Sequence, residues 1–229
     1  MDLLALACPC TEFKETKIGV RIITRPVGPL RANCYLVADK DSGSCFVIDP
    51  GGDPSIITGA IEATGCRLEA VFITHGHADH LGAVAEVATQ AGARVYGSSE
   101  VAEVLGSPDK YQLFPGMPTF KACKVDEVMS GGEKKIIGGI EVDVIATPGH
   151  STGSLTYYAA DSLFCGDLLF HGSIGRTDLP GGSFEVLAAS VKQLVLRFPS
   201  DTVVYPGHGN TTTLEQEKEN NPFLTDLGW

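Results

Sequence analysis

Four apolar, strand-like runs of this 229-residue sequence end in the same way. They end at Ile73, Ile145, Cys165 and Tyr205, and a histidine or an aspartate follows each of them within five residues. The polar residues beyond these runs are His75, His77, Asp79, His80, His150, Asp167 and His208. Rigid strands fix the loop residues at their carboxyl ends, where open α/β structures bind their ligands. The pattern therefore predicts an α/β fold with one polar site at its strand ends.

Strand-like and helix-like segments alternate along the rest of the chain. An apolar stripe of period 3.6 predicts a helix over residues 183–198, a weaker pattern predicts one over 54–64, and helical spacing also follows Asp79 as far as Ala91. The predicted strands cover residues 20–24, 34–38, 45–48, 70–73, 95–96, 136–137, 141–145, 154–158, 163–165 and 202–205. Because strands and helices interleave, we expect a layered α/β sandwich.

The segment 106–120 interrupts this alternation with three prolines and two glycines. We expect a long ordered loop that forms a lid or a pocket wall. In that role Tyr111, Phe114 and Met117 would touch a substrate. A loop that only packs on the surface is an equal alternative.

Length and charge limit the classes of function. A chain of 229 residues with 43% hydrophobic residues predicts one domain over residues 1–229, in which 1–16 form an N-terminal extension. The net charge of −11 argues against nucleic acid and anionic membranes as partners, and favours a small molecule. No apolar run reaches the roughly 18 residues of a membrane span. An anionic substrate would need a local basic residue.

The seven cysteines are odd in number and scattered, which argues against a disulfide framework. We therefore expect reduced thiols and a cytoplasmic location. An organelle lumen, such as the plastid or the mitochondrial matrix, is the alternative if a transit peptide has been removed. Cys165 could ligate a metal through its sulfur, but the role of a small buried apolar residue is favoured.

Three of the six histidines fall within residues 74–80, beside an aspartate. Neutral imidazoles and carboxylates are ligands that zinc, iron(II) and manganese(II) take in proteins. With the polar residues at the other strand ends they give five histidines and two aspartates, which is too many for one tetrahedral ion. The sequence therefore predicts two divalent metal ions that share a carboxylate, zinc first, with iron or manganese as alternatives.

A pair of such ions predicts hydrolysis. Two cations about 3.5–4 Å apart can share a water and lower its pKa toward roughly 7, so that hydroxide forms at neutral pH. The hydroxide attacks an electron-poor carbonyl or phosphoryl centre, while the cations polarise the accepting oxygen. No separate side-chain nucleophile is then required.

The H-x-H-x-D-H segment at residues 75–80 resembles the signature of the metallo-β-lactamase superfamily. Three further ligand-type residues follow in the order that this family has: His150, Asp167 and His208. Within the superfamily, the chain resembles the single-domain glyoxalase II-like proteins, the hydroxyacylglutathione hydrolases. Three segments carry this closer resemblance, at residues 172–180, 205–209 and 215–223.

The resemblance implies an αββα four-layer sandwich, with two facing β-sheets and helices outside. It implies one metal ion held by His75, His77 and His150, and a second held by Asp79, His80 and His208. Asp167 would bridge them, and Asp79 and Asp167 would take part in catalysis. The implied reaction is hydrolysis of a thioester such as S-lactoylglutathione, or another S-(2-hydroxyacyl)glutathione, to a 2-hydroxy acid and a free thiol by a metal-bridging hydroxide.

The substrate contacts are less well defined by the resemblance. Two-domain glyoxalase II enzymes carry a C-terminal helical extension with basic residues for glutathione, whereas here about twenty residues follow His208 and only Lys218 among them is basic. We expect Arg176 to bind a substrate carboxylate, with a structural ion pair to Asp178 as the alternative. His171 matches no ligand position, and we expect a structural role for it.

Other activities remain as alternatives. Persulfide dioxygenases share the fold and the G-R-T-D stretch, and would bind a single iron(II) through His75, His150 and Asp167. Members of that group tend to have alanine and aspartate around the last histidine, whereas this chain has glycine on both sides of His208, which favours the hydrolase. Lactonase activity is a further alternative. A non-catalytic metal-binding role and RNA processing are disfavoured by the complete ligand set and by the acidic charge.

Overall fold

A computed structural model of the chain describes residues 13–15, 19–111 and 119–225. Most of the N-terminal extension expected over residues 1–16 lies outside these ranges. Its residues 13–15 form the short strand β1 (Phe13–Glu15), which pairs antiparallel with β2 (Val20–Val27). Among the helices that the structure describes, none is long and apolar enough to cross a membrane.

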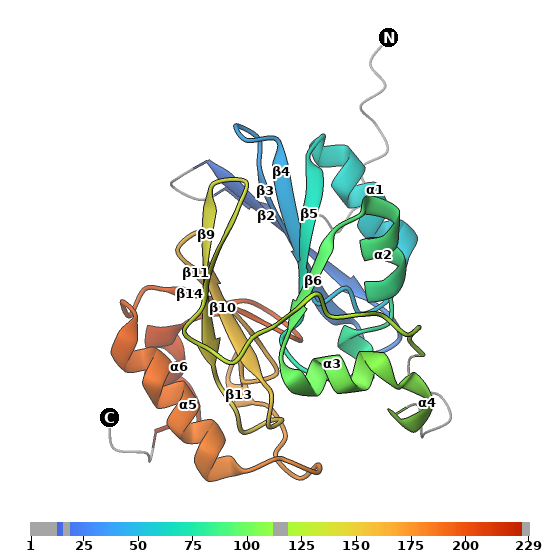
Figure 1. Cartoon of the computed structure of the whole chain (residues 1–229). Helices are drawn as coiled ribbons and strands as arrows, with labels where there is room; N and C mark the ends of the chain where they lie inside the picture. Colours follow the sequence, from blue (N-terminus) through green and yellow to red (C-terminus); the bar gives the residue numbers. More distant parts are fainter. Residues whose placement is uncertain (1–12, 16–18, 112–118, 226–229) are drawn as a thin grey trace.

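Two mixed β-sheets form the centre of the protein (Figure 1). The first has seven strands in the order β1 to β7, which after β2 are β3 (Ala32–Asp39), β4 (Ser44–Ile48), β5 (Arg67–Phe72), β6 (Arg94–Gly97) and β7 (Glu127–Val128). The second has the order β15-β14-β11-β10-β9-β8, with β8 (Lys134–Ile137), β9 (Ile140–Ala146), β10 (Leu155–Ala159), β11 (Ser162–Gly166), β14 (Val203–Pro206) and β15 (Thr212–Thr213). A separate hairpin consists of β12 (Leu169–Phe170) and β13 (Ser173–Ile174).

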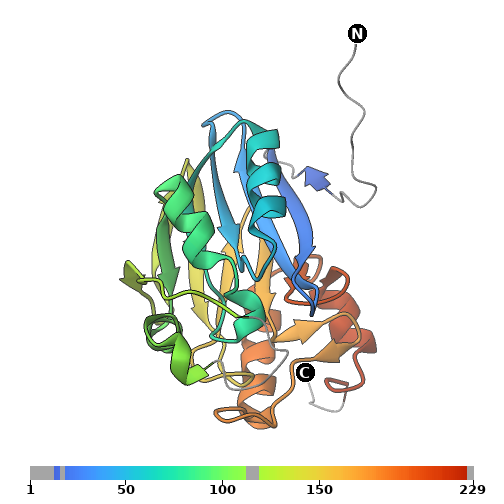
Figure 2. The same cartoon turned by 90° about the vertical axis from the view of Figure 1, so that its right-hand side faces the viewer.

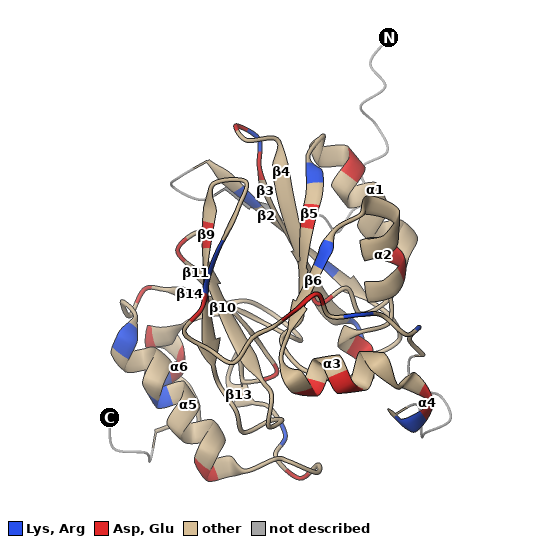
Figure 3. Cartoon of the chain, in the orientation of Figure 1, with Lys and Arg blue, Asp and Glu red and all other residues tan. Residues whose placement is uncertain are grey.

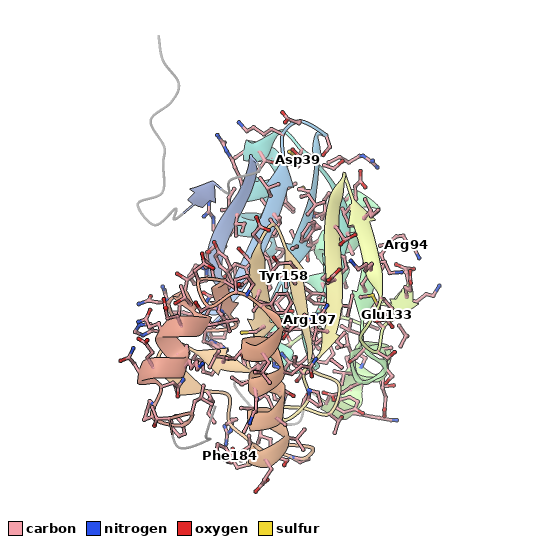
Figure 4. The ribbon with its side chains drawn as sticks, turned by 90° about the vertical axis from the view of Figure 1, so that its left-hand side faces the viewer. Asp39, Arg94, Glu133, Tyr158, Phe184 and Arg197 are labelled. Atoms are coloured by element: carbon pink, nitrogen blue, oxygen red, sulfur yellow. The ribbon has the colours of Figure 1, made fainter. Side chains whose placement is uncertain are left out.

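Helices cover the outer faces of both sheets, which confirms the predicted αββα sandwich (Figures 1 and 2). Beside the first sheet lie α1 (Pro54–Thr64), α2 (Val84–Ala91), α3 (Ser99–Gly106) and the one-turn α4 (Pro108–Tyr111). Beside the second lie α5 (Phe184–Arg197) and α6 (Leu214–Asn220). Figure 4 shows α5 on the outside of this sheet, with Phe184 and Arg197 at its opposite ends.

The apolar core forms one layer between the sheets and one beneath each helical layer. Strand β3 illustrates how one strand contributes to two of these layers. Nearly all of its residues are buried, and successive side chains point to opposite faces of the sheet. Leu36 packs on the side of α1 and α2, whereas Val37 packs between the sheets. The central layer joins the two sheets directly, since the rings of Phe72 and Tyr157 lie 5.0 Å apart.

The sequence predicted most of these elements. Each of the predicted strands is present, the predicted helix 54–64 is α1, and residues 183–198 contain α5. The loop expected over 106–120 is wrong in its first part, because 108–111 form α4 and the Tyr111 hydroxyl donates to Glu103 Oε1 at 2.8 Å. Phe114 and Met117 lie outside the described residues, so a substrate contact by this segment stays a prediction.

Candidate metal centre

The candidate site lies where strands of both sheets end. In the first sheet β4 and β5 are parallel, so the loops that begin at Asp49 and at Ile73 leave the same edge. In the second sheet β9 and β11 are both antiparallel to β10, and β11 is parallel to β14. The loops that carry His150, Asp167 and His208 therefore also leave a common edge. This arrangement brings all seven ligand-type residues together.

His75, His77 and His150 form the first group that could hold a metal ion. One nitrogen of each lies within 4.8 Å of the others. His150 Nε2 is 2.8 Å from His77 Nδ1, and the His75 ring centroid is 4.7 Å from that of His77. His75 and His150 are buried, and His77 is partly exposed. Three imidazole nitrogens at this spacing match the donor set of a zinc or iron site.

Asp79, His80 and His208 form the second group, again with donor atoms within 4.8 Å of one another. Asp79 and His80 lie in the 3-10 turn η1 (Ala78–His80), which leads toward α2. His208 Nε2 is 3.1 Å from Asp79 Oδ2, and His80 Nε2 is 3.6 Å from the same oxygen. Asp79 caps neither η1 nor α2, because the N-cap positions belong to His77 and Ala83. Its carboxylate faces the histidines instead.

Asp167 lies between the two groups. Its Oδ1 is 3.4 Å from His80 Nε2, and its Oδ2 is 3.7 Å from both His150 Nε2 and His208 Nε2. One carboxylate therefore reaches a member of each group, as a bridging ligand must. The cluster as a whole is suited to a binuclear metal site.

Sequence reasoning missed Asp49 and Thr74, which contact the Nδ1 atoms of His80 and His75 and so orient these two rings. Asp49 Oδ2 lies 3.0 Å from His80 Nδ1 and accepts from the Thr74 hydroxyl at 2.6 Å, while Thr74 Oγ1 lies 3.0 Å from His75 Nδ1. On the other side, His150 Nδ1 lies 2.8 Å from the carbonyl oxygen of Arg176. If each Nδ1 carries the proton and donates, the Nε2 atoms remain free for a metal ion. Asp49 follows β4 as the other polar residues follow their strands, and this signal could have identified it.

Glycines allow the loops to approach the cluster closely. A Cβ atom on Gly207 would lie 2.0 Å from Asp167 Oδ1, one on Gly51 would lie 1.7 Å from the Asp79 carbonyl oxygen, and one on Gly175 would lie 1.7 Å from the Asp167 carbonyl oxygen. No larger side chain fits these positions without a shift of the backbone or of a ligand-type carboxylate.

Burial and the neighbouring charges set the protonation states. Burial lowers the pKa of His77 to about 4 and that of His75 well below its ordinary value, so both rings are neutral. For Asp79, burial acts upward, but the hydrogen bond with His208 and the nearby imidazoles hold the pKa at about 2. Burial alone would lower the pKa of His80, yet the carboxylates of Asp167 and Asp49 raise it well above its ordinary value. Ionised carboxylates and neutral imidazoles are the states that bind cations.

Three buried atoms of the cluster test whether its residues fit a metal ion. His75 Nε2, His80 Nε2 and Asp167 Oδ1 have no hydrogen-bond partner within the described part of the chain. Buried polar atoms in proteins almost always have such a partner, and an unpaired one costs roughly 1–3 kcal/mol. All three atoms belong to ligand-type residues at the centre of the cluster. A bound cation would satisfy them, so the residues fit the metals that the sequence predicts.

Several other sequence predictions concern residues around this cluster. Arg176 forms the ion pair with Asp178 that was its alternative, with Nε–Oδ1 and Nη2–Oδ2 distances of 2.8 Å, and both side chains are exposed. His171 is exposed, and its Nε2 lies 2.8 Å from Gln216 Nε2. Cys165 lies in the apolar layer beneath α5, and burial raises the pKa of its thiol to about 12.

A serine-hydrolase pattern in the same region has a different explanation. Residues 149–153 match G-x-S-x-G, the pattern around the nucleophile of many serine hydrolases. Ser151 is buried, however, and its hydroxyl lies 3.0 Å from that of Ser154. The two glycines instead let this loop approach its neighbours closely, Gly149 against Leu187 of α5 and Gly153 against Ser98 and Glu100.

Comparison with known proteins places the chain in a family. Residues 27–208 match the profile of the metallo-beta-lactamase superfamily, and the chain belongs to it. It is 35% identical to hydroxyacylglutathione hydrolase GloC of Haemophilus influenzae over 204 residues, which cover 87% of this chain and 95% of that protein. It is 37% identical to the probable metallo-hydrolase YqgX of Bacillus subtilis over 203 residues, with the same coverage.

Solved structures give the same assignment. The B3 metallo-beta-lactamase BLEG-1 superposes with a TM-score of 0.83 and 36% identity over 89% of this chain and 99% of that one. TTHA1623 in a di-iron-bound form superposes with a TM-score of 0.77 and 35% identity over 88% and 99%. ETHE1 from Myxococcus xanthus has a TM-score of 0.71 and 25% identity over 91% of both chains.

Proposed function

We propose that this protein is a metal-dependent hydrolase that cleaves a thioester such as S-lactoylglutathione to a 2-hydroxy acid and a free thiol. The observation that carries the proposal is the pair of ligand groups that Asp167 joins. The similarity to a protein named hydroxyacylglutathione hydrolase supports the thioester, and hence a glutathione-linked small molecule, as the substrate.

In this proposal His75, His77 and His150 hold one ion, and Asp79, His80 and His208 hold the second. Asp167 contributes an oxygen to each. Two divalent cations at such a site supply Lewis acidity, which activates a water and polarises the acyl oxygen of the substrate. Zinc is the first candidate for both, and the di-iron-bound form of TTHA1623 supports iron as an alternative, with manganese accepted by the same donors.

The protein's own residues prepare the site for this reaction. Asp79 and Asp167 stay ionised, because the imidazoles around them hold the pKa of each carboxyl below its ordinary value despite burial. Their negative charge retains the cations, which is the catalytic role that we propose for both. Asp49 and Thr74 fix the imidazole rings, so that the donor atoms need little rearrangement before reaction.

The proposal for Arg176 remains that it binds a substrate carboxylate. Its backbone position beside His150 supports this role, since the Arg176 carbonyl oxygen lies against His150 Nδ1. The substrate would have to displace Asp178 from the guanidinium group. Exposed ion pairs contribute only about 0–1 kcal/mol, so this exchange has a small cost.

A second candidate is a one-iron persulfide dioxygenase, a group whose G-R-T-D stretch this chain matches at residues 175–178. That enzyme would need only His75, His150 and Asp167 as ligands. The hydrolase accounts in addition for the three donors of the second group, Asp79, His80 and His208, which lie within 4.8 Å of one another. We therefore prefer the hydrolase.

One experiment separates these activities. The purified protein, loaded in turn with zinc, iron(II) and manganese(II), is assayed for thiol release from S-lactoylglutathione and for oxygen consumption with glutathione persulfide. A β-lactam serves as a third substrate, because BLEG-1 is named a metallo-beta-lactamase. We expect thiol release to dominate and Asp167→Asn to lower metal content and thioesterase activity together. Oxygen consumption without thiol release would overturn the proposal.

A cytoplasmic location is also proposed. The five cysteines in the described part of the chain are all free, which agrees with a reducing compartment. Thiol counting under native and denaturing conditions, without reductant, would test this directly.

A further inference from the structure

The turn between β2 and β3 lies directly against the candidate metal centre. The backbone N–H of Asn33 donates to the Gly207 carbonyl oxygen at 2.7 Å, and Asn33 Nδ2 donates to the Gly209 carbonyl oxygen at 2.9 Å. These carbonyls flank His208 on both sides. At the start of the turn, the Gly28 N–H donates to Asp53 Oδ2 at 2.8 Å, in the loop that follows Asp49. The turn is therefore fixed at the rim of the site from two directions.

Arg31 is the last residue of this turn, directly before β3, and it has two unusual properties. Its φ of 53° is in the left-handed region, which costs a non-glycine residue roughly 1–2 kcal/mol. Its side chain is exposed, and its guanidinium has no ion pair within residues 19–111 and 119–225. Arg176, the other arginine near the ligand loops, already has Asp178 as its partner. A substrate carboxylate therefore displaces no partner when it binds Arg31, whereas at Arg176 it has to displace Asp178.

A pocket lies on the same side of the centre. Its volume is about 350 Å³, and it is lined by Phe170, His171, His208, Gly209 and Asn210. None of these residues carries a carboxylate, although the protein has a net charge of −11. Gly209 belongs both to the pocket lining and to the hydrogen bond that anchors the Arg31 turn. The pocket and the chain that follows Arg31 thus share a contact at Gly209.

The surrounding charge makes one cation at this rim important. Figure 3 shows acidic residues along α3, and the first turns of α3 and α5 contain Glu100 and Glu185. An anionic substrate that approaches the loops of the site therefore has acidic residues of α3 and α5 nearby. The guanidinium on the turn bonded to Gly209 would give such a substrate one attractive contact, and its planar group suits a carboxylate.

We propose that Arg31 is a specificity-determining residue, which binds a carboxylate of the thiol half of the substrate while that half occupies the pocket beside His208. This inference rests on the proposed thioesterase function and narrows it to thioesters of carboxylate-bearing thiols. The acyl half would then face the two ligand groups.

The test uses the metal-loaded full chain and the variant Arg31→Asn. Asparagine tolerates the left-handed region, so the turn keeps its shape while the guanidinium is lost. Two substrates with the same acyl group are compared: S-lactoylglutathione, whose thiol carries carboxylates, and S-lactoyl-N-acetylcysteamine, whose thiol carries none. The control is Lys40→Asn, which removes the same charge from an exposed turn at the opposite end of β3.

We expect Arg31→Asn to raise KM for S-lactoylglutathione about fivefold, the size of a solvent-exposed ion pair, with kcat within about twofold. Kinetics with S-lactoyl-N-acetylcysteamine should not change, and Lys40→Asn should match the wild type with both. An equal effect on both substrates, no effect on either, or the same effect in Lys40→Asn would overturn the inference.

A binding measurement keeps the inference separate from the proposed function. Calorimetry with S-methylglutathione, which cannot be hydrolysed, should give a Kd about fivefold weaker for Arg31→Asn than for the wild type. If neither thioester is cleaved but this difference is found, the thioesterase proposal fails and the role of Arg31 stands. Equal affinities, or no binding by the wild type, would refute the role of Arg31 even if thioesters are cleaved.

Discussion

Replacement of Gly207 by alanine is expected to disrupt the metal centre without removal of a ligand. The new Cβ would lie 2.0 Å from Asp167 Oδ1, 2.9 Å from His80 Cε1 and 3.0 Å from the carbonyl carbon of Gly166. The φ of Gly207 is not in the left-handed region, so the effect is steric and not a matter of backbone strain. Because protein atoms do not approach to 2.0 Å, the Asp167 carboxylate has to move by about 1 Å.

A displacement of about 1 Å is large enough to affect both activity and stability. Misplacement of a reacting or positioning group by about 1 Å can lower activity on the order of 100-fold. Overpacking of a tight site also lowers stability by about 1–3 kcal/mol. We therefore expect Gly207→Ala to fold, to hold fewer than two metal ions per chain, and to lose about 100-fold in kcat/KM for S-lactoylglutathione.

The assay combines metal content by mass spectrometry, kcat/KM, and the Tm of the metal-free protein. Gly43→Ala, in the turn between β3 and β4, is the control: its Cβ would meet nothing within 4 Å, but its φ of +67° is strained for alanine. That variant should lose about 1 kcal/mol of stability and keep its metal ions and activity. A Gly207→Ala protein with two metal ions per chain and nearly unchanged kcat/KM would refute the steric argument, and with it the position given to Asp167.

Three further predictions concern the residues around the centre. Asp49→Asn removes the charged acceptor behind His80 and Thr74, and should weaken metal affinity about 10–100-fold in a chelator competition, whereas unchanged affinity would remove Asp49 from the site. Arg176→Ala should raise KM more than it lowers kcat, since its contact is proposed for the bound substrate; kinetics equal to the wild type would leave Arg176 only its ion pair with Asp178. Metal binding should release protons near neutral pH, because Asp167 and Asp49 raise the pKa of His80 in the metal-free protein and the cation must displace that proton. The affinity of the second group should therefore fall as the pH is lowered from 7 to 5, and calorimetry that detects no proton release would contradict this.

The strands of the fold could be predicted because each has its own pattern. The two-residue strands β7, β12, β13 and β15 could not, since neighbouring segments determine their pairing and not their own residues. Helix α3 is a different case: Ser98 caps it by accepting from the Val101 N–H, and Val101, Val104 and Leu105 are its buried residues. This capping and spacing are present in the sequence, so α3 could have been found.

The candidate site likewise has features that the sequence could predict and features that it could not. Ligand-type residues were predictable because their chemistry and their positions after strands are local properties. Their mutual distances were not, because His80 and His208 are joined only through the packing of one sheet on the other. Asp49 follows its strand as the ligand-type residues follow theirs and could have been found, but its left-handed φ of 51° is visible only in the structure.

The two sheets are held together at the site end by contacts that involve no metal ion. Asn33 Nδ2 donates to the Pro206 carbonyl oxygen at 3.0 Å, and the Tyr35 hydroxyl donates to the same oxygen. The Tyr157 hydroxyl donates to the Ile73 carbonyl oxygen at 2.6 Å, just before the H-x-H-x-D-H segment. All three side chains are buried, so these hydrogen bonds fix strand ends of the first sheet to strand ends of the second. Each ligand group takes residues from both sheets, so the fold sets the distances within each group, and cations would bind to donors already in place.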